Sequence, residues 1–191
     1  MLLERLGAEW EWVAVDILAG EARTADFRLK SPHGRVPVLE PRPGVFLPES
    51  NAILCYLAEG TPWLPDDRLD RAQVLRWMFF EQNNHETSIA VSRALCNGYY
   101  DAALDPEERQ ERLRQLRGPG LAALKTMESR LRREDWFVGP GETIADLALY
   151  AYTHTAGEGG FDLDSFPGVQ AWLERVESHP RHIRLADLLR R

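Results

Sequence analysis

The chain has 191 residues, of which 44% are hydrophobic and 28% charged, and its formal net charge is −7. This balance is typical of a globular protein and argues against a nucleic-acid partner, which would call for a basic surface. No apolar run approaches the roughly 20 residues that a membrane-spanning helix needs. The start of the chain, MLLERLGAEW, lacks the basic and apolar regions of a signal peptide. Two cysteines without a CxxC motif indicate a reduced, cytoplasmic protein.

Short helices and strands are expected to alternate in the first part of the chain. They are a helix end at 1–7, a strand at 10–17, a helix at 22–30, strands at 36–40 and 45–47, and a helix that Ser50 caps. The two later strands are joined by a tight turn, so they predict an antiparallel hairpin. Ile53, Tyr56 and Leu57 share one face of the last helix.

After the segment EGTPWLPDD the character of the sequence changes, and amphipathic helical patterns continue to the end. They cover 68–95, 106–133 with an interruption or bend at 118–120, 141–154, 166–180 and 181–191. Thr143 and Asp146 resemble a capping box in which an aspartate replaces the usual glutamate. The sequence therefore predicts an α/β domain over residues 1–60 and an all-helical domain over residues 66–191.

Two residue pairs in the α/β part point to a ligand. Pro37 cannot donate to a β-ladder, and Val36 before it is forced to be extended, which leaves its N–H and C=O groups free to pair with an extended peptide. Ser50, at a helix start, offers a hydroxyl beside unpaired N–H groups that attract a carboxylate, and Glu49 can hold an ammonium group. Together they predict a receptor for an amino-acid zwitterion with a peptide-like middle, and glutathione is such a molecule.

These residues resemble the glutathione S-transferase family. GRVPVLE followed by ESNAILCYLAEGTPWLP is similar to its glutathione-binding half, and RAQVLRWMFFEQ and IADLALYAYTH are similar to its helical half. The resemblance implies a thioredoxin-like domain, a cis bond at Pro37, pairing of Val36 with the glutathione backbone, and a γ-glutamyl site at Glu49 and Ser50. It also implies that Arg35 and His33 contact the glycine carboxylate of glutathione.

The resemblance further implies a cytosolic homodimer that transfers glutathione, as co-substrate, to an electrophilic small molecule in detoxification. The helical domain would supply the acceptor pocket, for which Phe80, Asn83 and Asn84 are candidates. The alternative is that such aromatic residues at helical spacing simply belong to the core.

One part of the family pattern is missing. In the family, the first strand of the thioredoxin-like domain ends at a Ser, Tyr or Cys that favours the glutathione thiolate, whereas this sequence resembles the family only from the end of the first helix. We therefore assign no catalytic residue, and we expect the neighbours of that strand to lose ladder partners. Either the start is mis-assigned, or the protein is a non-catalytic glutathione- or protein-binding module. A related reaction, namely thiol–disulfide exchange, isomerisation or dehalogenation, is a third possibility.

Other candidate residues have ordinary explanations. Glu49 and Ser50 alone would fit a simple helix cap. Cys55 is expected to be a small buried residue and Cys96 to be inert. His179 and His182 have a spacing that metal ligands can show, but no acid or cysteine completes a site, so we expect solvent-facing histidines and no metal.

Overall fold

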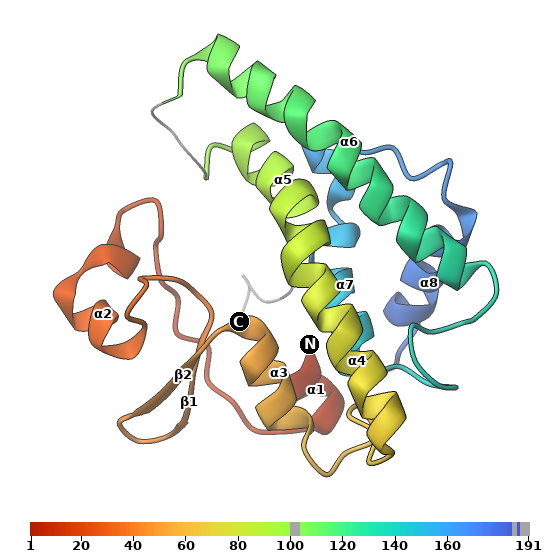
Figure 1. The fold of residues 1–191 in the computed structure, drawn as a ribbon. Coiled ribbons are helices and arrows are strands. Elements are labelled where there is room, and N and C mark those ends of the chain that lie inside the picture. The colour runs from red at the N-terminus through yellow and green to blue at the C-terminus, as the bar shows by residue number, and fades with distance from the viewer. Residues whose placement is uncertain (100–103, 185–186, 188–191) are drawn as a thin grey trace.

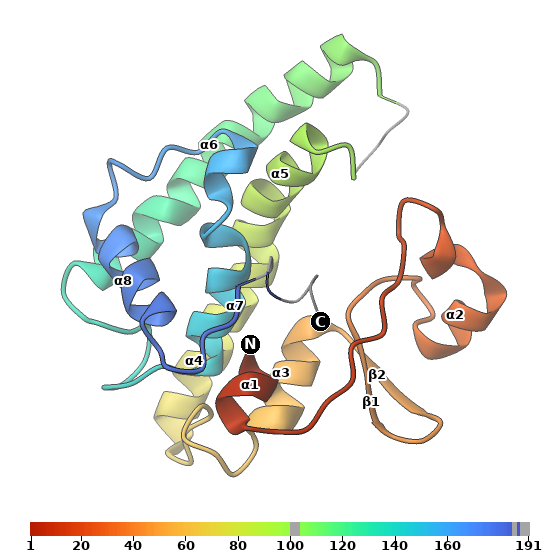
Figure 2. The same cartoon turned by 180° about the vertical axis from the view of Figure 1, so that it is seen from behind.

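The computed structural model describes all residues except 100–103, 185–186 and 188–191. A small α/β domain with few strands lies beside a larger helical domain, and the amino terminus lies between them (Figures 1 and 2). The elements of the first domain are α1 (Leu2–Leu6), the 3-10 turn η1 (Glu21–Arg23), α2 (Ala25–Lys30), β1 (Val38–Arg42), β2 (Val45–Pro48) and α3 (Ser50–Ala58).

The predicted hairpin is confirmed. Strands β1 and β2 pair antiparallel, with Val38 opposite Pro48 and Leu39 opposite Leu47. The strand begins two residues later than predicted, so Val36 and Pro37 precede the ladder instead of belonging to it. Within the described residues the sheet has these two strands and no others.

The predicted strand at 10–17 is wrong. The segment is extended but joins no sheet, and residues 11–15 have no backbone hydrogen-bond partner among the described residues. Trp12 and Val13 are 52% and 69% exposed. The β-branched and aromatic composition is that of a strand, but a strand also needs a neighbour on which its ladder can form.

The second domain is helical, as predicted. Its elements are α4 (Arg68–Phe80), the π-helical η2 (Glu81–Ala90), α5 (Val91–Cys96), α6 (Pro106–Leu131), α7 (Ile144–Thr153), the 3-10 turn η3 (Ala156–Gly159) and α8 (Pro167–Glu177). Helix α7 lies in the middle, with α4, η2 and α8 packed against it (Figure 2). The predicted helix at 181–191 falls largely outside the described residues. None of the described helices has the length and apolarity required to cross a membrane.

Of the predicted interruption or bend at 118–120, the interruption is wrong, because α6 runs unbroken through Pro119, while the bend stays a prediction. Gly120 is needed there for close packing. A Cβ atom at this position would lie 2.3 Å from Cζ of Phe161, so only glycine lets that ring rest on the helix. Here glycine serves helix packing and does not break the helix.

The capping box of α7 is confirmed. The Thr143 backbone N–H and hydroxyl both donate to Asp146 Oδ2 at 2.9 Å. The other carboxylate oxygen accepts from the Phe137 N–H at 3.2 Å and from Trp172 Nε1 at 3.0 Å. Because this fully buried carboxylate ties three segments together, the cap also organises the core of the helical domain.

Candidate glutathione site

The two predicted residue pairs lie at the same end of the hairpin. The ladder ends where Val38 is opposite Pro48, so Val36 and Pro37 directly precede β1 and Glu49 and Ser50 directly follow β2. The Val36–Pro37 peptide bond is cis, as the resemblance implied. Val36 is 43% exposed, and its backbone N–H and C=O groups have no partner among the described residues. An open peptide edge therefore lies next to the start of α3.

Ser50 does not cap α3, which corrects the sequence prediction. The N-cap residue is Glu49, and Ser50 is the first residue of the helix. Glu49 has a φ of 75°, and within the described residues it is the one non-glycine residue with a positive φ. This backbone conformation turns the chain from β2 directly into the helix. Such outliers cost about 1–3 kcal/mol and cluster at functional sites.

The start of α3 offers free polar groups. No side chain accepts a hydrogen bond from its first N–H groups, so the positive end of the helix is uncapped by the described residues. The side chains of Glu49 and Ser50 are exposed, and neither forms a hydrogen bond or ion pair with a described residue. One carboxylate, one hydroxyl and unpaired N–H groups thus share one open surface. They complement an ammonium group and a carboxylate held close together.

His33 and Arg35 lie on the turn that leads into this edge. The Arg35 N–H donates to Ser31 Oγ at 3.1 Å, and Gly34, with φ 63°, makes the turn sharp. Both the imidazole and the guanidinium are exposed. Neither is hydrogen-bonded within the part of the chain that the structure describes, so both groups are available to an anion.

The three candidate acceptor-pocket residues lie on α4 and η2. Phe80 is half-buried and packs edge-on against Trp77, with the ring centroids 5.3 Å apart. The exposed Asn83 donates its side-chain amide to the Phe79 carbonyl at 2.8 Å. Asn84 is exposed as well. Their role in substrate binding stays a prediction.

A polar cluster at the interface of the two domains was missed by the sequence reasoning. Asn51 Nδ2, on α3, donates to Glu81 Oε2 of η2 at 3.1 Å, and Gln82 Nε2 donates to the same oxygen at 2.8 Å. Gln82 Nε2 also lies 2.5 Å from Glu86 Oε2. Burial raises the pKa of Glu81 to about 7, the two amide donors lower it, and Glu86 raises it further.

The sequence did contain a signal for this cluster. Val74, Trp77, Met78 and Glu81 follow an i, i+3, i+4, i+7 pattern, and the structure buries all four. A carboxylate at the last position of an apolar stripe needs a polar partner from another element. Asn51, directly after the Glu-Ser pair, supplies it.

The two cysteines and the His179/His182 pair differ in burial. Cys55 is half-buried and burial raises the pKa of its thiol, whereas Cys96 is exposed. His179 and His182 are half-buried, which corrects the expected solvent-facing position, and burial lowers the pKa of both. No cluster of metal-binding side chains occurs among the described residues.

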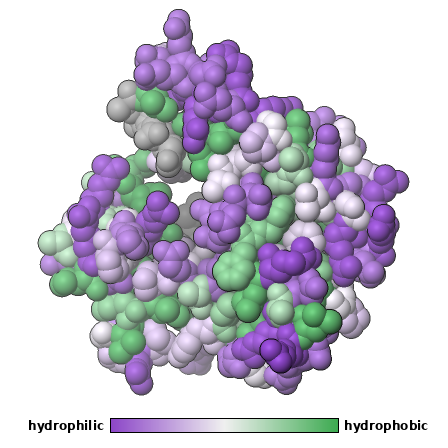
Figure 3. Space-filling view, viewed as in Figure 1, coloured by the Kyte–Doolittle hydropathy of each residue, from purple (hydrophilic) through white to green (hydrophobic). Residues whose placement is uncertain are grey.

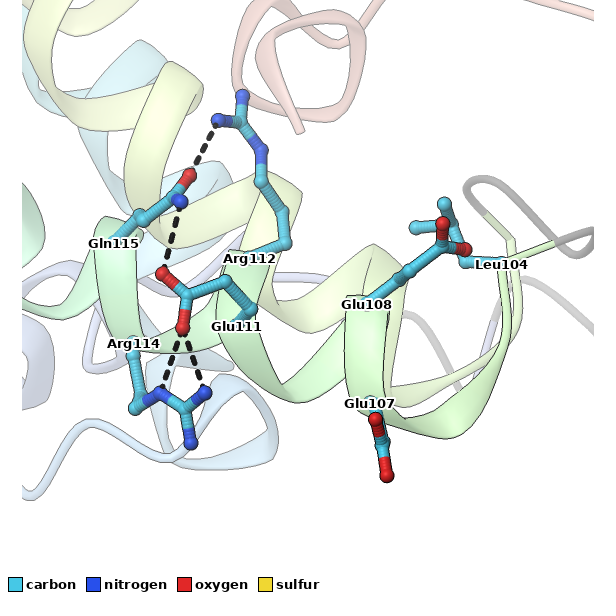
Figure 4. Close-up of a pocket in the computed structure, with 7 residues that line it drawn as sticks. All are labelled: Leu104, Glu107, Glu108, Glu111, Arg112, Arg114 and Gln115. Carbon is cyan, nitrogen blue, oxygen red and sulfur yellow. Dashed lines mark hydrogen bonds and ion pairs between the residues drawn. The ribbon is translucent and has the colours of Figure 1, made fainter.

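Two surface hollows of the helical domain lie away from this site. One, of about 560 Å³, is an open depression along the first turns of α6, where its charged side chains bond mainly to one another (Figure 4). Another, of about 600 Å³, lies where α6 meets the start of α8. Charged and polar side chains predominate in the lining of both, so neither resembles the apolar acceptor pocket that was predicted.

The fold defines the class of the protein: a thioredoxin-like α/β domain with a small sheet, followed by a mostly helical domain. The family model "Glutathione S-transferase, N-terminal domain" matches residues 1–59, and "Glutathione S-transferase, C-terminal domain" matches residues 87–180. The chain belongs to the glutathione S-transferase family.

Individual relatives agree with this assignment. A crystal structure of a glutathione S-transferase from Pseudomonas fluorescens is 51% identical with a TM-score of 0.90, over 96% of this chain and 89% of that one. "Glutathione S-transferase F14" of Arabidopsis thaliana is 34% identical, over 93% of this chain and 73% of that protein. "Disulfide-bond oxidoreductase YfcG" of Escherichia coli is 26% identical, over 94% and 84%.

Proposed function

We propose that this protein binds glutathione between the Val36 edge and the start of α3 and transfers it to an electrophilic small molecule. The observation that carries the proposal is the open start of α3, where Glu49 and Ser50 are exposed and without protein partners. In a member of this family, free polar groups at the start of this helix favour the binding of a ligand with a zwitterionic end.

Each residue has a defined role in this proposal. Ser50 and the first N–H groups of α3 hold the γ-glutamyl carboxylate, and Glu49 holds the ammonium group. Val36 pairs with the peptide middle of glutathione. Arg35 and His33 face its glycine carboxylate. This arrangement supplies binding and orientation, so that the glutathione sulfur, once its proton has left to solvent, attacks the electrophilic carbon at close range.

We also propose a cytosolic homodimer that serves detoxification. Support for a dimer comes from large apolar side chains exposed on α3 and α4, namely Tyr56 at 56%, Leu69 at 67% and Phe79 at 64%. Figure 3 shows green, apolar patches among the hydrophilic residues on the side of the molecule that is seen in Figure 1. Association of two copies through this face would remove that surface from water.

A second function is supported by one relative. YfcG is named a disulfide-bond oxidoreductase. The same binding site would then serve thiol–disulfide exchange, or binding without catalysis. Assays with both kinds of acceptor separate these functions.

Calorimetric titration with glutathione tests the binding step. We expect Ser50→Ala to weaken binding about tenfold, because it removes a hydrogen bond to a charged group. Ser129→Ala, at an exposed position on α6, is the matched control and should bind like the parent protein. Conjugation to 1-chloro-2,4-dinitrobenzene then reports transfer, and reduction of hydroxyethyl disulfide reports exchange. Unchanged affinity in Ser50→Ala would overturn the proposed site.

A further inference from the structure

The buried Glu81 connects the helical domain to the proposed glutathione site. Its side chain belongs to the π-helical η2, which continues α4, and only 2% of it is exposed. Asn51 reaches it from α3 at 3.1 Å and also donates to the Met78 carbonyl at 3.3 Å. Asn51 is the second residue of α3 and directly follows Ser50. Among the described residues, the hydrogen bonds that join the first turn of α3 to the helical domain come from this amide.

The described surroundings of Glu81 contain no compensating cation. Among the described residues no arginine or lysine pairs with it, and its neighbours are amides, Glu86 and Tyr152. From α3 it meets Asn51, from η2 it meets Gln82 and Glu86, and from α7 the phenol of Tyr152 lies nearby. A buried carboxylate without a cation is costly in its ionised form, and hydrogen-bond donors must stabilise it.

We propose that Glu81 is a positioning residue for glutathione: its ionised form anchors the Asn51 amide and so holds the first turn of α3 in the conformation that binds the γ-glutamyl end. The inference rests on the proposed function. It makes glutathione affinity depend on the protonation of a side chain that does not touch the ligand. Protonated Glu81 is a weaker acceptor, so Asn51 and the helix start lose their anchor.

The pKa values around the site identify Glu81 as the group that titrates near neutrality. Its pKa is raised to about 7, chiefly by burial. Burial lowers the pKa of the neighbouring His85 to about 4 and raises that of Tyr152 to about 12. Both therefore stay neutral between about pH 6 and pH 8, the interval in which Glu81 changes its charge.

Titration calorimetry with S-methylglutathione, which has no ionisable thiol, tests the inference from about pH 6 to pH 8. For a bound state that requires ionised Glu81, we expect binding about tenfold weaker at the acidic end. Glu81→Gln should lose this pH dependence and bind with intermediate affinity, since its amide oxygen still accepts from Asn51. Asn51→Ala should bind weakly at every pH.

Two control variants separate Glu81 from other titrating groups. Glu86→Gln leaves the Asn51 contact intact and removes the negative charge that raises the Glu81 pKa, so the profile should keep its shape and shift to lower pH. His33→Gln should keep the same pH midpoint. If the pH midpoint of binding shifts in His33→Gln, the titrating group is the exposed imidazole, and the inference is overturned.

The outcomes distinguish this inference from the proposed function. Failure of the parent protein to bind S-methylglutathione at any pH would overturn the proposed function, and the inference with it. Normal binding with a flat pH profile, or with a profile that Glu81→Gln leaves unchanged, would overturn the inference alone. Carbon-13 NMR of the glutamate carboxyl groups in the free protein adds a ligand-independent readout. The Glu81 pKa should rise in Asn51→Ala, and no rise would contradict the anchoring contact.

Discussion

Arg5 and Glu142 form a buried ion pair that joins the first helix of the chain to the loop before α7. Nε of Arg5 lies 2.5 Å from Oε2, and the two side chains are 0% and 7% exposed. Nη2 donates to Oε1 at 2.9 Å and also to the Val176 carbonyl at 3.0 Å. The pair is bidentate, so it fixes α1 on the helical domain in one orientation.

We expect Arg5→Met to lower the free energy of unfolding by about 3–5 kcal/mol, because it leaves the Glu142 carboxylate buried without its partner. Urea unfolding followed by circular dichroism measures this change. The double variant Arg5→Met, Glu142→Leu should recover most of the loss, since it removes both charges.

The control for this experiment is an exposed ion pair. Arg114 pairs with Glu111 on the surface of α6, and Arg114→Met should change stability by less than about 1 kcal/mol. If Arg5→Met lowers the free energy of unfolding no more than Arg114→Met does, the buried pair does not hold the two domains together.

The backbone of Glu49 is expected to lower the stability of the protein, while its carboxylate is expected to strengthen glutathione binding. Glycine adopts a positive φ without steric cost, so Glu49→Gly should raise the free energy of unfolding by about 1 kcal/mol. The same change should weaken glutathione binding, because the carboxylate that faces the ammonium group is lost. Glu49→Gln keeps the backbone cost and removes only the charge, so it should lose affinity without gaining stability. Urea unfolding and calorimetry on both variants separate the two effects, and a glycine variant of lowered stability would refute the strain argument.

Hydrogen exchange should distinguish the unpaired segment from the rest of the α/β domain. Residues 11–15 have no backbone partners among the described residues, so their amides should exchange about as fast as those of an unstructured peptide. The amides of α7, which lies in the core, serve as the internal reference and should exchange far more slowly. Mass spectrometry of peptic fragments reads both. Slow exchange at 11–15 would mean that this segment has found a ladder partner in solution.

The elements that could be predicted from the sequence are those with a local cause. Thr143 and Asp146 predict the start of α7, because a capping box acts over three residues. The hairpin follows from its tight turn and from the two short apolar runs on either side. Segment 10–17 shows the limit. Its composition is right for a strand, but strand formation depends on a partner elsewhere in the chain.

In the candidate site, too, the features with a local cause could be predicted and those that depend on distant residues could not. Val36 and Glu49 could be selected because proline and helix-start chemistry are local signals. The positive φ of Glu49 was beyond prediction, since a glutamate rarely adopts it and nothing nearby in the sequence requires it. The contact between Asn51 and Glu81 joins residues 30 positions apart, and it depends on how the two domains pack.

His85 should make stability depend on pH in the acidic range. It is fully buried, its Nε2 lies 2.9 Å from Thr153 Oγ1, and that hydroxyl donates to the Leu149 carbonyl at 2.7 Å. Since the hydroxyl proton is used in that second bond, Nε2 carries the proton of the neutral imidazole and donates it to Thr153. Burial lowers the pKa of His85 from 6.5 to about 4.

The direction of the effect follows from proton binding in the two states. Between about pH 4 and pH 6.5 the unfolded chain binds a proton at His85 that the folded protein does not, so stability rises with pH across this interval by about 3 kcal/mol. Glu81 acts in the opposite direction, because its folded pKa is raised from 4.5 to about 7. Asp146 acts in the same direction as Glu81, because burial raises its folded pKa from 3.8 to about 6. The pH dependence of the stability of the parent protein therefore combines opposing contributions and does not report His85 alone.

A matched pair of variants separates the two residues. The free energy of unfolding of His85→Leu should lack the rise with pH, so that the difference between the parent protein and this variant grows by about 3 kcal/mol from about pH 4 to pH 6.5. His33→Gln, at an exposed position, controls for histidine titration in general and should follow the parent protein. Urea unfolding at closely spaced pH values measures both. A difference between the parent protein and His85→Leu that stays constant with pH would show that His85 titrates alike in the folded and unfolded chains, which its burial should prevent.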